Sequence, residues 1–213
     1  MLKLRVDMVS DVVCPWCIIA YKRLEKALQL MAVDYELLWH PFELNPTMPL
    51  EGQNLREHVA NKYGTTIEES IKAQQSITQF GQEVGFEFNF FEDMRIFNTR
   101  KAHQLLMWSL SQAKQTELEL AIFDAYFTKG LDISDDKVLL DTVASLGLDT
   151  ELAHQVLDEK SWGKTVSSTE KQWLDAQITA VPTIVLNRHH VISGAQSSEQ
   201  MMAIIKEVAI QVH

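Results

Sequence analysis

The chain has few cysteines, and they do not match a metal site. Only two occur in 213 residues, and the seven histidines show no H-x3-5-H spacing that would complete a zinc ligand set. No apolar run approaches the length of a membrane-spanning helix. We therefore expect neither a bound metal nor a membrane partner.

An excess of positive charge is also missing. Asp and Glu number 29 against 19 Lys and Arg, so the net charge is −10. Surfaces that bind nucleic acid or anionic lipid need clustered cations, so neither is an expected partner. The acidic residues are spread along the chain, which is typical of solvated helix faces. The apolar fraction of 46% is enough for the core of one large domain or of a domain with a large insertion.

No secretory leader precedes the first strand-like stretch. Arg5, Asp7 and Asp11 interrupt the apolar segment that a leader would need. We therefore predict that the protein works in the cytoplasm. Structural disulfides are unusual in that reducing compartment, so a cysteine pair there is expected to be reversible and catalytic.

The two cysteines lie together in the stretch Cys14-Pro15-Trp16-Cys17, where an apolar segment ends and a helical pattern begins. Residues i and i+3 lie on neighbouring helical turns, so the two sulfurs are close enough to form a disulfide. Pro15 suits the first helical position, which places Cys14 at the helix cap beside unpaired N–H groups. A thiolate is favoured there, so we expect Cys14 to have a lowered pKa and to attack, with Cys17 buried and resolving.

The motif has two other interpretations: half of a zinc site, and a pair of inert, packed cysteines. The lack of a second cysteine pair weighs against zinc. Inert buried cysteines seldom occur at a helix start marked by proline, so the pattern favours redox chemistry.

The apolar periodicity predicts a strand–helix–strand unit at the N-terminus, and its short link predicts parallel strands with a right-handed crossover. Three prolines then indicate a loop over 41–49. Helical patterns follow, interrupted by an aromatic stretch at 86–91 that is either a short strand or a buried loop. Near the C-terminus, β-branched residues predict an antiparallel hairpin, and Ser197 has capping-box spacing before a last helix.

These patterns divide the chain into residues 1–50, an inserted helical part over 51–170, and residues 171–213. The predicted strands cover residues 2–9, 34–40, 178–187 and 190–193. The predicted helices cover 15–32, 66–84, 99–113, 117–127, 134–146, 150–160 and 161–177, and a last helix has an apolar face from Met201 to Val212.

Pro182 lies inside the last β-branched run, where it removes a hydrogen-bond donor from any strand ladder. One interpretation is a residue at the entry of a strand. The other is a cis Val181–Pro182 bond in a tight turn that leaves backbone groups open to an extended peptide. The residues themselves leave both interpretations open.

Five ordered segments resemble the DsbA-like thioredoxin-fold disulfide oxidoreductases, particularly the FrnE-like branch, which lacks a secretion signal. The resemblance implies an α/β fold, a thioredoxin-like mixed β-sheet flanked by helices with a large all-helical insertion. It also implies that Val181 and Pro182 bind substrate, with Pro182 as a cis-proline facing the disulfide, and that Pro15 and Trp16 tune the redox pair. The matching segments are residues 10–17, 41–46, 98–100, 181–183 and 194–196.

We therefore predict a protein dithiol–disulfide oxidoreductase or isomerase that uses no cofactor, with Cys14 as the nucleophile and Cys17 as the resolving thiol. The expected partner is a protein or peptide that carries a thiol or a disulfide, and glutathione is a further candidate as co-substrate. The Pro-Trp dipeptide differs from the Pro-His of the secreted DsbA oxidants, so strong oxidising power is not implied.

Two rival functions stay open, and the first rests on a similarity of architecture. One is a glutathione-dependent transferase or isomerase of the kappa and 2-hydroxychromene-2-carboxylate isomerase type. In those relatives a serine usually occupies the position of Cys14 and the second cysteine is missing, so the pair found here counts against this function. The other rival is a non-catalytic peptide-binding module that uses the helical insertion as its groove.

Overall fold

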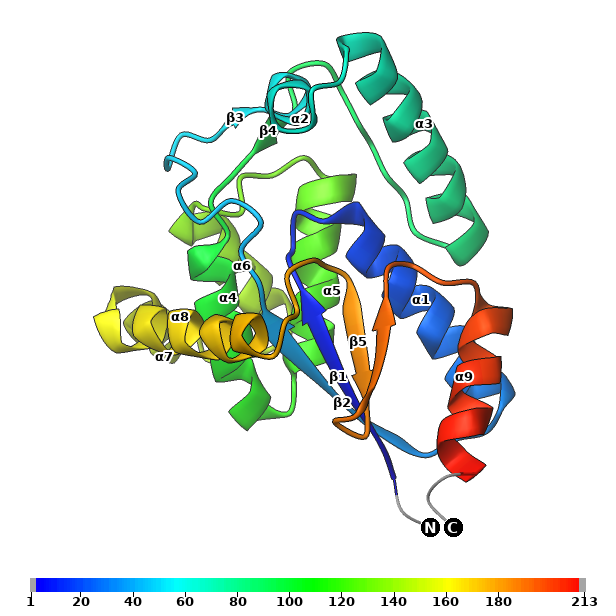
Figure 1. The fold of residues 1–213 in the computed structure, drawn as a ribbon. Helices are drawn as coiled ribbons and strands as arrows, with labels where there is room; N and C mark the ends of the chain where they lie inside the picture. The colour runs from blue at the N-terminus through cyan, green and yellow to red at the C-terminus, as the bar shows by residue number, and fades with distance from the viewer. Residues whose placement is uncertain (1–2, 211–213) are drawn as a thin grey trace.

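A four-stranded mixed sheet forms the centre of the molecule, in a computed structural model that describes residues 3–210 (Figure 1). β1 (Leu4–Ser10) and β2 (Tyr35–Pro41) are parallel and joined by α1 (Pro15–Leu30). β5 (Thr183–Leu186) pairs antiparallel with both β1 and β6 (His190–Ser193), which gives the order β2-β1-β5-β6. The predicted parallel unit and the predicted hairpin are both confirmed. Leu2 and Val212, which the predictions included, lie outside the described residues.

Helices cover both faces of this sheet. α1 packs against α9 (Ser198–Ile210) on one face, where Val6 and Met8 of β1 enter the main core. The next residue of the strand, Val9, points to the other face and packs in a small cluster with Trp173 of α8 (Lys160–Asp175). This alternation follows from the two-residue period of a strand, and it buries β1 on both sides.

The edge strand β2 is covered by a side chain from the helical insertion. Gln115 of α5 (Gln115–Phe123) accepts a hydrogen bond from the backbone N–H of Trp39 at 2.9 Å and donates one to its carbonyl at 3.0 Å. The amide thus takes the place of a neighbouring strand, which protects an otherwise open sheet edge. The sequence predicts that the strand ends before Pro41, but Pro41 is the last residue of β2. An edge strand tolerates a proline because no N–H is needed there to pair with a further strand.

The chain between β2 and β5 is mostly helical. It also contains a short antiparallel ladder of β3 (Gln53–Asn54) and β4 (Arg95–Ile96), so the expectation of an all-helical insertion is wrong in this detail. Strands of two residues carry no periodic signal, which is why the pattern missed them. The remaining helices are α2 (Leu55–Tyr63), α3 (Ile67–Val84), α4 (Arg100–Ser109), α6 (Asp136–Ser145) and α7 (Thr150–Asp158), with a 3-10 turn over Leu110–Gln112 and a π turn over Asp124–Thr128.

Several predicted helix ends are confirmed. Thr66 forms a capping box with Glu69 at the start of α3, and Ser197 and Gln200 form the same reciprocal pair before α9. The predicted start of α6 at Ser134 is wrong because Asp135 is the cap and accepts from the N–H of Lys137. None of the helices within residues 3–210 combines the length and the apolar character that crossing a membrane requires.

The predicted strand over 178–187 is also too long, because β5 begins only at Thr183. The preceding residue, Pro182, has no N–H to give to a ladder, so regular pairing starts after it. Residues 178–182 instead form a loop that lies beside the start of α1, as the functional site shows.

Candidate functional site

Cys14 lies at the N-terminus of α1, as the sequence predicts. β1 ends at Ser10, and a short turn follows in which the N–H of Cys14 donates to the carbonyl of Asp11 at 2.9 Å. Cys14 itself keeps an extended backbone, with φ −93° and ψ 109°, and Pro15 is the first helical residue. Pro15 is preorganised for a first helical turn and has no N–H to leave unpaired, so the local sequence accounts for this helix start.

The two cysteine thiols have different environments. Both are free thiols, with Cys14 5% exposed and Cys17 fully buried. Burial raises the pKa of the Cys17 thiol well above its ordinary value, and the hydrogen bond and charge of Cys14 raise it further. The Ser10 hydroxyl and the Asp11 backbone lower the pKa of Cys17 by a smaller amount. The neutral thiol of Cys17 is therefore favoured when Cys14 is also reduced.

The loop before β5 faces Cys14 across the site. The Val181–Pro182 peptide bond is cis, and the Cys14 Sγ lies 3.9 Å from the carbonyl oxygen of Val181. The N–H of Gly194, at the end of β6, donates to the carbonyl of Pro182 at 2.9 Å and fixes the loop to the hairpin. The fold thus brings together Cys14 and a loop that is 167 residues away in sequence.

The two residues between the cysteines are placed differently. Pro15 is partly buried in the helix start, whereas Trp16 is 38% exposed. The Trp16 ring packs against Phe80 of α3, with ring centroids 5.7 Å apart. The motif is therefore in direct contact with the helical insertion.

A cavity of about 290 Å³ opens beside Cys14. Its walls come from the start of α1, from α2 and α3, and from the loop at Val181, and they are mainly apolar. Among the described residues that line the cavity, Lys62 of α2 is the one lysine or arginine, and its Nζ donates to the carbonyl of Leu44 and to Asn45 Oδ1, both at 2.8 Å. The site thus offers a mainly apolar recess that Cys14 itself lines.

A buried polar cluster lies beneath the cysteines, and sequence reasoning missed it. Ser10 Oγ donates to Glu119 Oε1 of α5 at 2.9 Å, and His103 Nε2 of α4 lies 3.3 Å from Asp11 Oδ1. The other Asp11 carboxylate oxygen accepts from the N–H of Leu44 at 2.7 Å. The sequence does indicate that Glu119 is buried, because at helical spacing Glu119 falls on the same face as the apolar residues three and four positions later.

The charges in this cluster depend on one another. Burial raises the pKa of Glu119 to about 7, although His103 and the Ser10 hydroxyl oppose that rise. Burial alone would lower the pKa of His103, but the adjacent carboxylate of Asp11 outweighs it, so the net shift of the His103 pKa is upward. Titratable groups therefore lie directly under the redox motif.

The segments 41–46 and 98–100, which carry part of the resemblance, have a structural role. Their side chains and backbone groups join the loop after β2 to the helices. Arg100 of α4 forms an ion pair with the buried carboxylate of Glu43 and donates to Ser167 Oγ of α8 at 2.6 Å. The N–H of Glu43 in turn donates to Glu170 Oε1 at 2.8 Å. These bonds hold the loop that carries Leu44 and Asn45 to the edge of the cavity.

A mixed sheet, a Cys-x-x-Cys pair at the start of its first helix and a helical insertion define a protein with a thioredoxin-like fold of the DsbA type. The chain belongs to the DSBA-like thioredoxin domain family, which matches residues 5–206.

Similar proteins support the same assignment. The uncharacterized protein YwbO of Bacillus subtilis (strain 168) is 26% identical over 195 residues, which cover 91% of this chain and 92% of that protein. The crystal structure of the probable DsbA oxidoreductase SCO1869 from Streptomyces coelicolor superposes with a TM-score of 0.90 at 26% identity, over 96% of this chain and 89% of that one. A 2-hydroxychromene-2-carboxylate isomerase shares the fold, with a TM-score of 0.68 at 15% identity over 98% of this chain and 96% of that one. Family and structural similarity together assign the chain to the DsbA-like thioredoxin fold.

Proposed function

We propose that this protein exchanges disulfides with a protein or peptide substrate, with Cys14 as the attacking sulfur and Cys17 as the resolving sulfur. The observation that carries the proposal is the placement of the Cys14 Sγ. It lies at a helix N-terminus, 3.9 Å from the Val181 carbonyl beside a cis-proline, with the buried Cys17 thiol one helical turn away. Pro182 and Val181 would then align an extended substrate backbone next to the reacting sulfur.

The reaction begins with the reduced pair and a substrate disulfide. The Cys14 thiolate attacks one substrate sulfur, a mixed disulfide forms, and the first substrate thiolate leaves. Cys17 then loses its proton and attacks Cys14, which forms the Cys14–Cys17 disulfide and releases the second substrate sulfur as a thiolate. The proton of Cys17 and one from solvent convert the two released thiolates into thiols, so two electrons pass from protein to substrate. Oxidation of a substrate dithiol is the reverse reaction.

Substitution of each cysteine tests these roles. Cys17→Ser removes the resolving thiol, so it should accumulate a mixed disulfide with the substrate, visible by mass spectrometry. Because Cys14 is then the one cysteine left in the chain, any trapped adduct must lie there. Cys14→Ser should abolish exchange while circular dichroism shows a folded protein. Full exchange activity in Cys14→Ser would overturn the assignment.

Substitutions of the two cysteines also distinguish the rival functions. The likeness to the isomerase concerns the fold alone, and the retention of both cysteines supports dithiol chemistry. A glutathione-dependent transferase or isomerase would keep its activity in Cys17→Ser, because that chemistry needs no resolving thiol. A peptide-binding module would keep its affinity in a Cys14→Ala/Cys17→Ala variant, and its parent would show no exchange.

The finer assignments stay predictions from the sequence. These are the FrnE-like branch, the cytoplasmic location, the tuning of the redox pair by Pro15 and Trp16, and glutathione as a co-substrate. The equilibrium constant of the Cys14/Cys17 pair with glutathione would show whether the protein acts as a reductase, an isomerase or an oxidant.

A further inference from the structure

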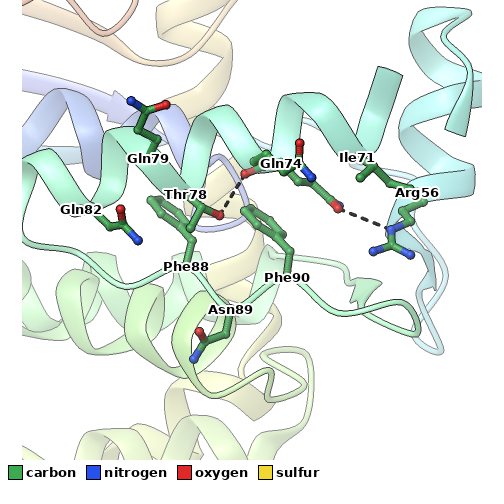
Figure 2. Close-up of a pocket in the computed structure, with 10 residues that line it drawn as sticks. Arg56, Ile71, Gln74, Thr78, Gln79, Gln82, Phe88, Asn89 and Phe90 are labelled. Carbon is green, nitrogen blue, oxygen red and sulfur yellow. Dashed lines mark hydrogen bonds between the residues drawn. The ribbon is translucent and has the colours of Figure 1, made fainter. Parts of the chain in front are cut away.

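We propose that a groove along α3 is a second substrate subsite, which binds the backbone of a polypeptide substrate beside its disulfide. This inference rests on the proposed function and specifies its substrate as a polypeptide chain rather than a small thiol. Figure 2 shows the groove, which has a volume of about 460 Å³.

The groove has an apolar floor and a wall of amide side chains. Phe88 and Phe90, from the loop over 86–91, form the floor, with parallel rings whose centroids are 5.7 Å apart (Figure 2). Residues of α3 at helical spacing form the wall, and within residues 3–210 Arg56 is the one charged side chain that lines the groove. The amide residues of this wall are Gln74, Gln75, Gln79 and Gln82.

The groove adjoins the cavity beside Cys14. Gln74 and Phe90 line both spaces, so they form the partition between them. Ser70, Ala73 and Ile77 of α3 face the cavity at Cys14, while the next residues around the helix face the groove. The cavity and the groove therefore adjoin along α3, and in the proposed complex the substrate chain passes over this partition from Cys14 to the groove.

The amides of the wall are free to bind a ligand. In the part of the chain that the structure describes, no hydrogen bond engages the exposed side chains of Gln75, Gln79 and Gln82. Gln74 is more constrained, because its Oε1 accepts from Arg56 Nε at 3.4 Å. Asn89 also lines the groove, but its side-chain N–H donates to the Thr128 carbonyl at 2.9 Å, so it is already used.

A side-chain amide has the same donor and acceptor groups as a peptide unit. A row of them therefore matches the backbone of an extended chain without selecting its side-chain charges. From Gln74 to Gln82 the helix rises by roughly 12 Å, the length of about four extended residues. Glutathione has too short a backbone to occupy both spaces, and its two carboxylates and ammonium group find few charged partners in the groove.

The test compares a long and a short disulfide in single-turnover exchange with the pre-reduced protein. The long substrate is a twelve-residue peptide with a central cysteine disulfide-bonded to cysteamine, and the short one is 2-hydroxyethyl disulfide. The variant is Gln75→Ala/Gln79→Ala/Gln82→Ala, which removes three exposed amides and keeps helix propensity high. It should raise the half-saturating concentration of the peptide about tenfold, and leave the rate with 2-hydroxyethyl disulfide unchanged.

A matched control alters the same helix away from the groove. Glu68→Ala/Lys72→Ala/Ser76→Ala replaces three exposed residues of α3 that line neither space, and it should behave as the parent with both substrates. Unchanged peptide saturation in the glutamine variant would overturn the subsite, and so would an equal loss with both disulfides. A parent protein that exchanges with neither disulfide would instead refute the proposed function, on which the subsite depends.

Discussion

The buried carboxyl group of Glu119 makes a quantitative prediction for stability against pH. Glu119 is fully buried in α5 and accepts from Ser10, and it faces His103 and Asp11. Burial raises its pKa from the ordinary 4.5 to about 7, so between these values the native state keeps a proton that the unfolded chain has lost. Stability falls with rising pH wherever the native state binds more protons, so this group destabilises the protein from about pH 4.5 upward.

The size of the effect follows from the same two values. A pKa difference of about 2.5 corresponds to about 3 kcal/mol of unfolding free energy, all of it expressed above pH 7. Glu119→Gln keeps the shape of the side chain and an acceptor for Ser10 but does not ionise. Its stability relative to the parent should therefore improve by about 3 kcal/mol between about pH 4.5 and about pH 8. Any packing cost of the amide is independent of pH and cancels in this comparison.

The measurement is urea unfolding of both proteins across that pH range, followed by circular dichroism with a reductant present. Glu117→Gln on the same helix is the matched control, because Glu117 is exposed and Lys114 lowers its pKa. That variant should show no gain in relative stability at high pH. A constant gap between Glu119→Gln and the parent from pH 5 to 8 would refute the reasoning, since it would mean that Glu119 is ionised throughout.

Two further predictions concern buried ion pairs. Burial disfavours the Asp7 carboxylate, but hydrogen bonds from His40 and Arg5 outweigh it and lower the pKa of Asp7 to about 2. The ionised carboxylate therefore stabilises the folded protein above about pH 4, and this stabilisation is lost as the pH falls through 2. Unfolding experiments in acid should show this loss, because the unfolding free energy of the parent should fall by about 2 kcal/mol more than that of Asp7→Asn between about pH 4 and about pH 2. An equal fall in both proteins would contradict the pairing of Asp7 with His40 and Arg5. Arg100→Met leaves the buried carboxylate of Glu43 unpaired and should cost about 3–5 kcal/mol in urea unfolding. A Glu43→Gln/Arg100→Met double variant should recover part of that loss, and an additive loss would show that the ion pair is not responsible.

The sequence alone determined the features that depend on neighbouring residues. Pro15 next to Cys14 predicted a helix start, and the Thr66 and Ser197 capping boxes predicted two more. The short link between the first two strands predicted parallel pairing, which the register from Leu4–Tyr35 onward confirms. The caps act within a few residues and the crossover within one strand–helix–strand unit, so a single sequence is enough to apply these rules.

The resemblance implied that Pro182 faces the disulfide, but only the tertiary structure decided which contacts are made around the sulfurs. The contact between Cys14 and Val181 joins residues 167 positions apart, and the bond from Ser10 to Glu119 spans 109. Such contacts depend on how whole elements pack, and no local pattern records that choice. The same reason explains why Gln74, which is unremarkable in the sequence, and Phe90 of the aromatic stretch 86–91 lie between two adjoining spaces. Local chemistry placed the reactive pair at a helix end, and packing over long sequence distances built the site in which it reacts.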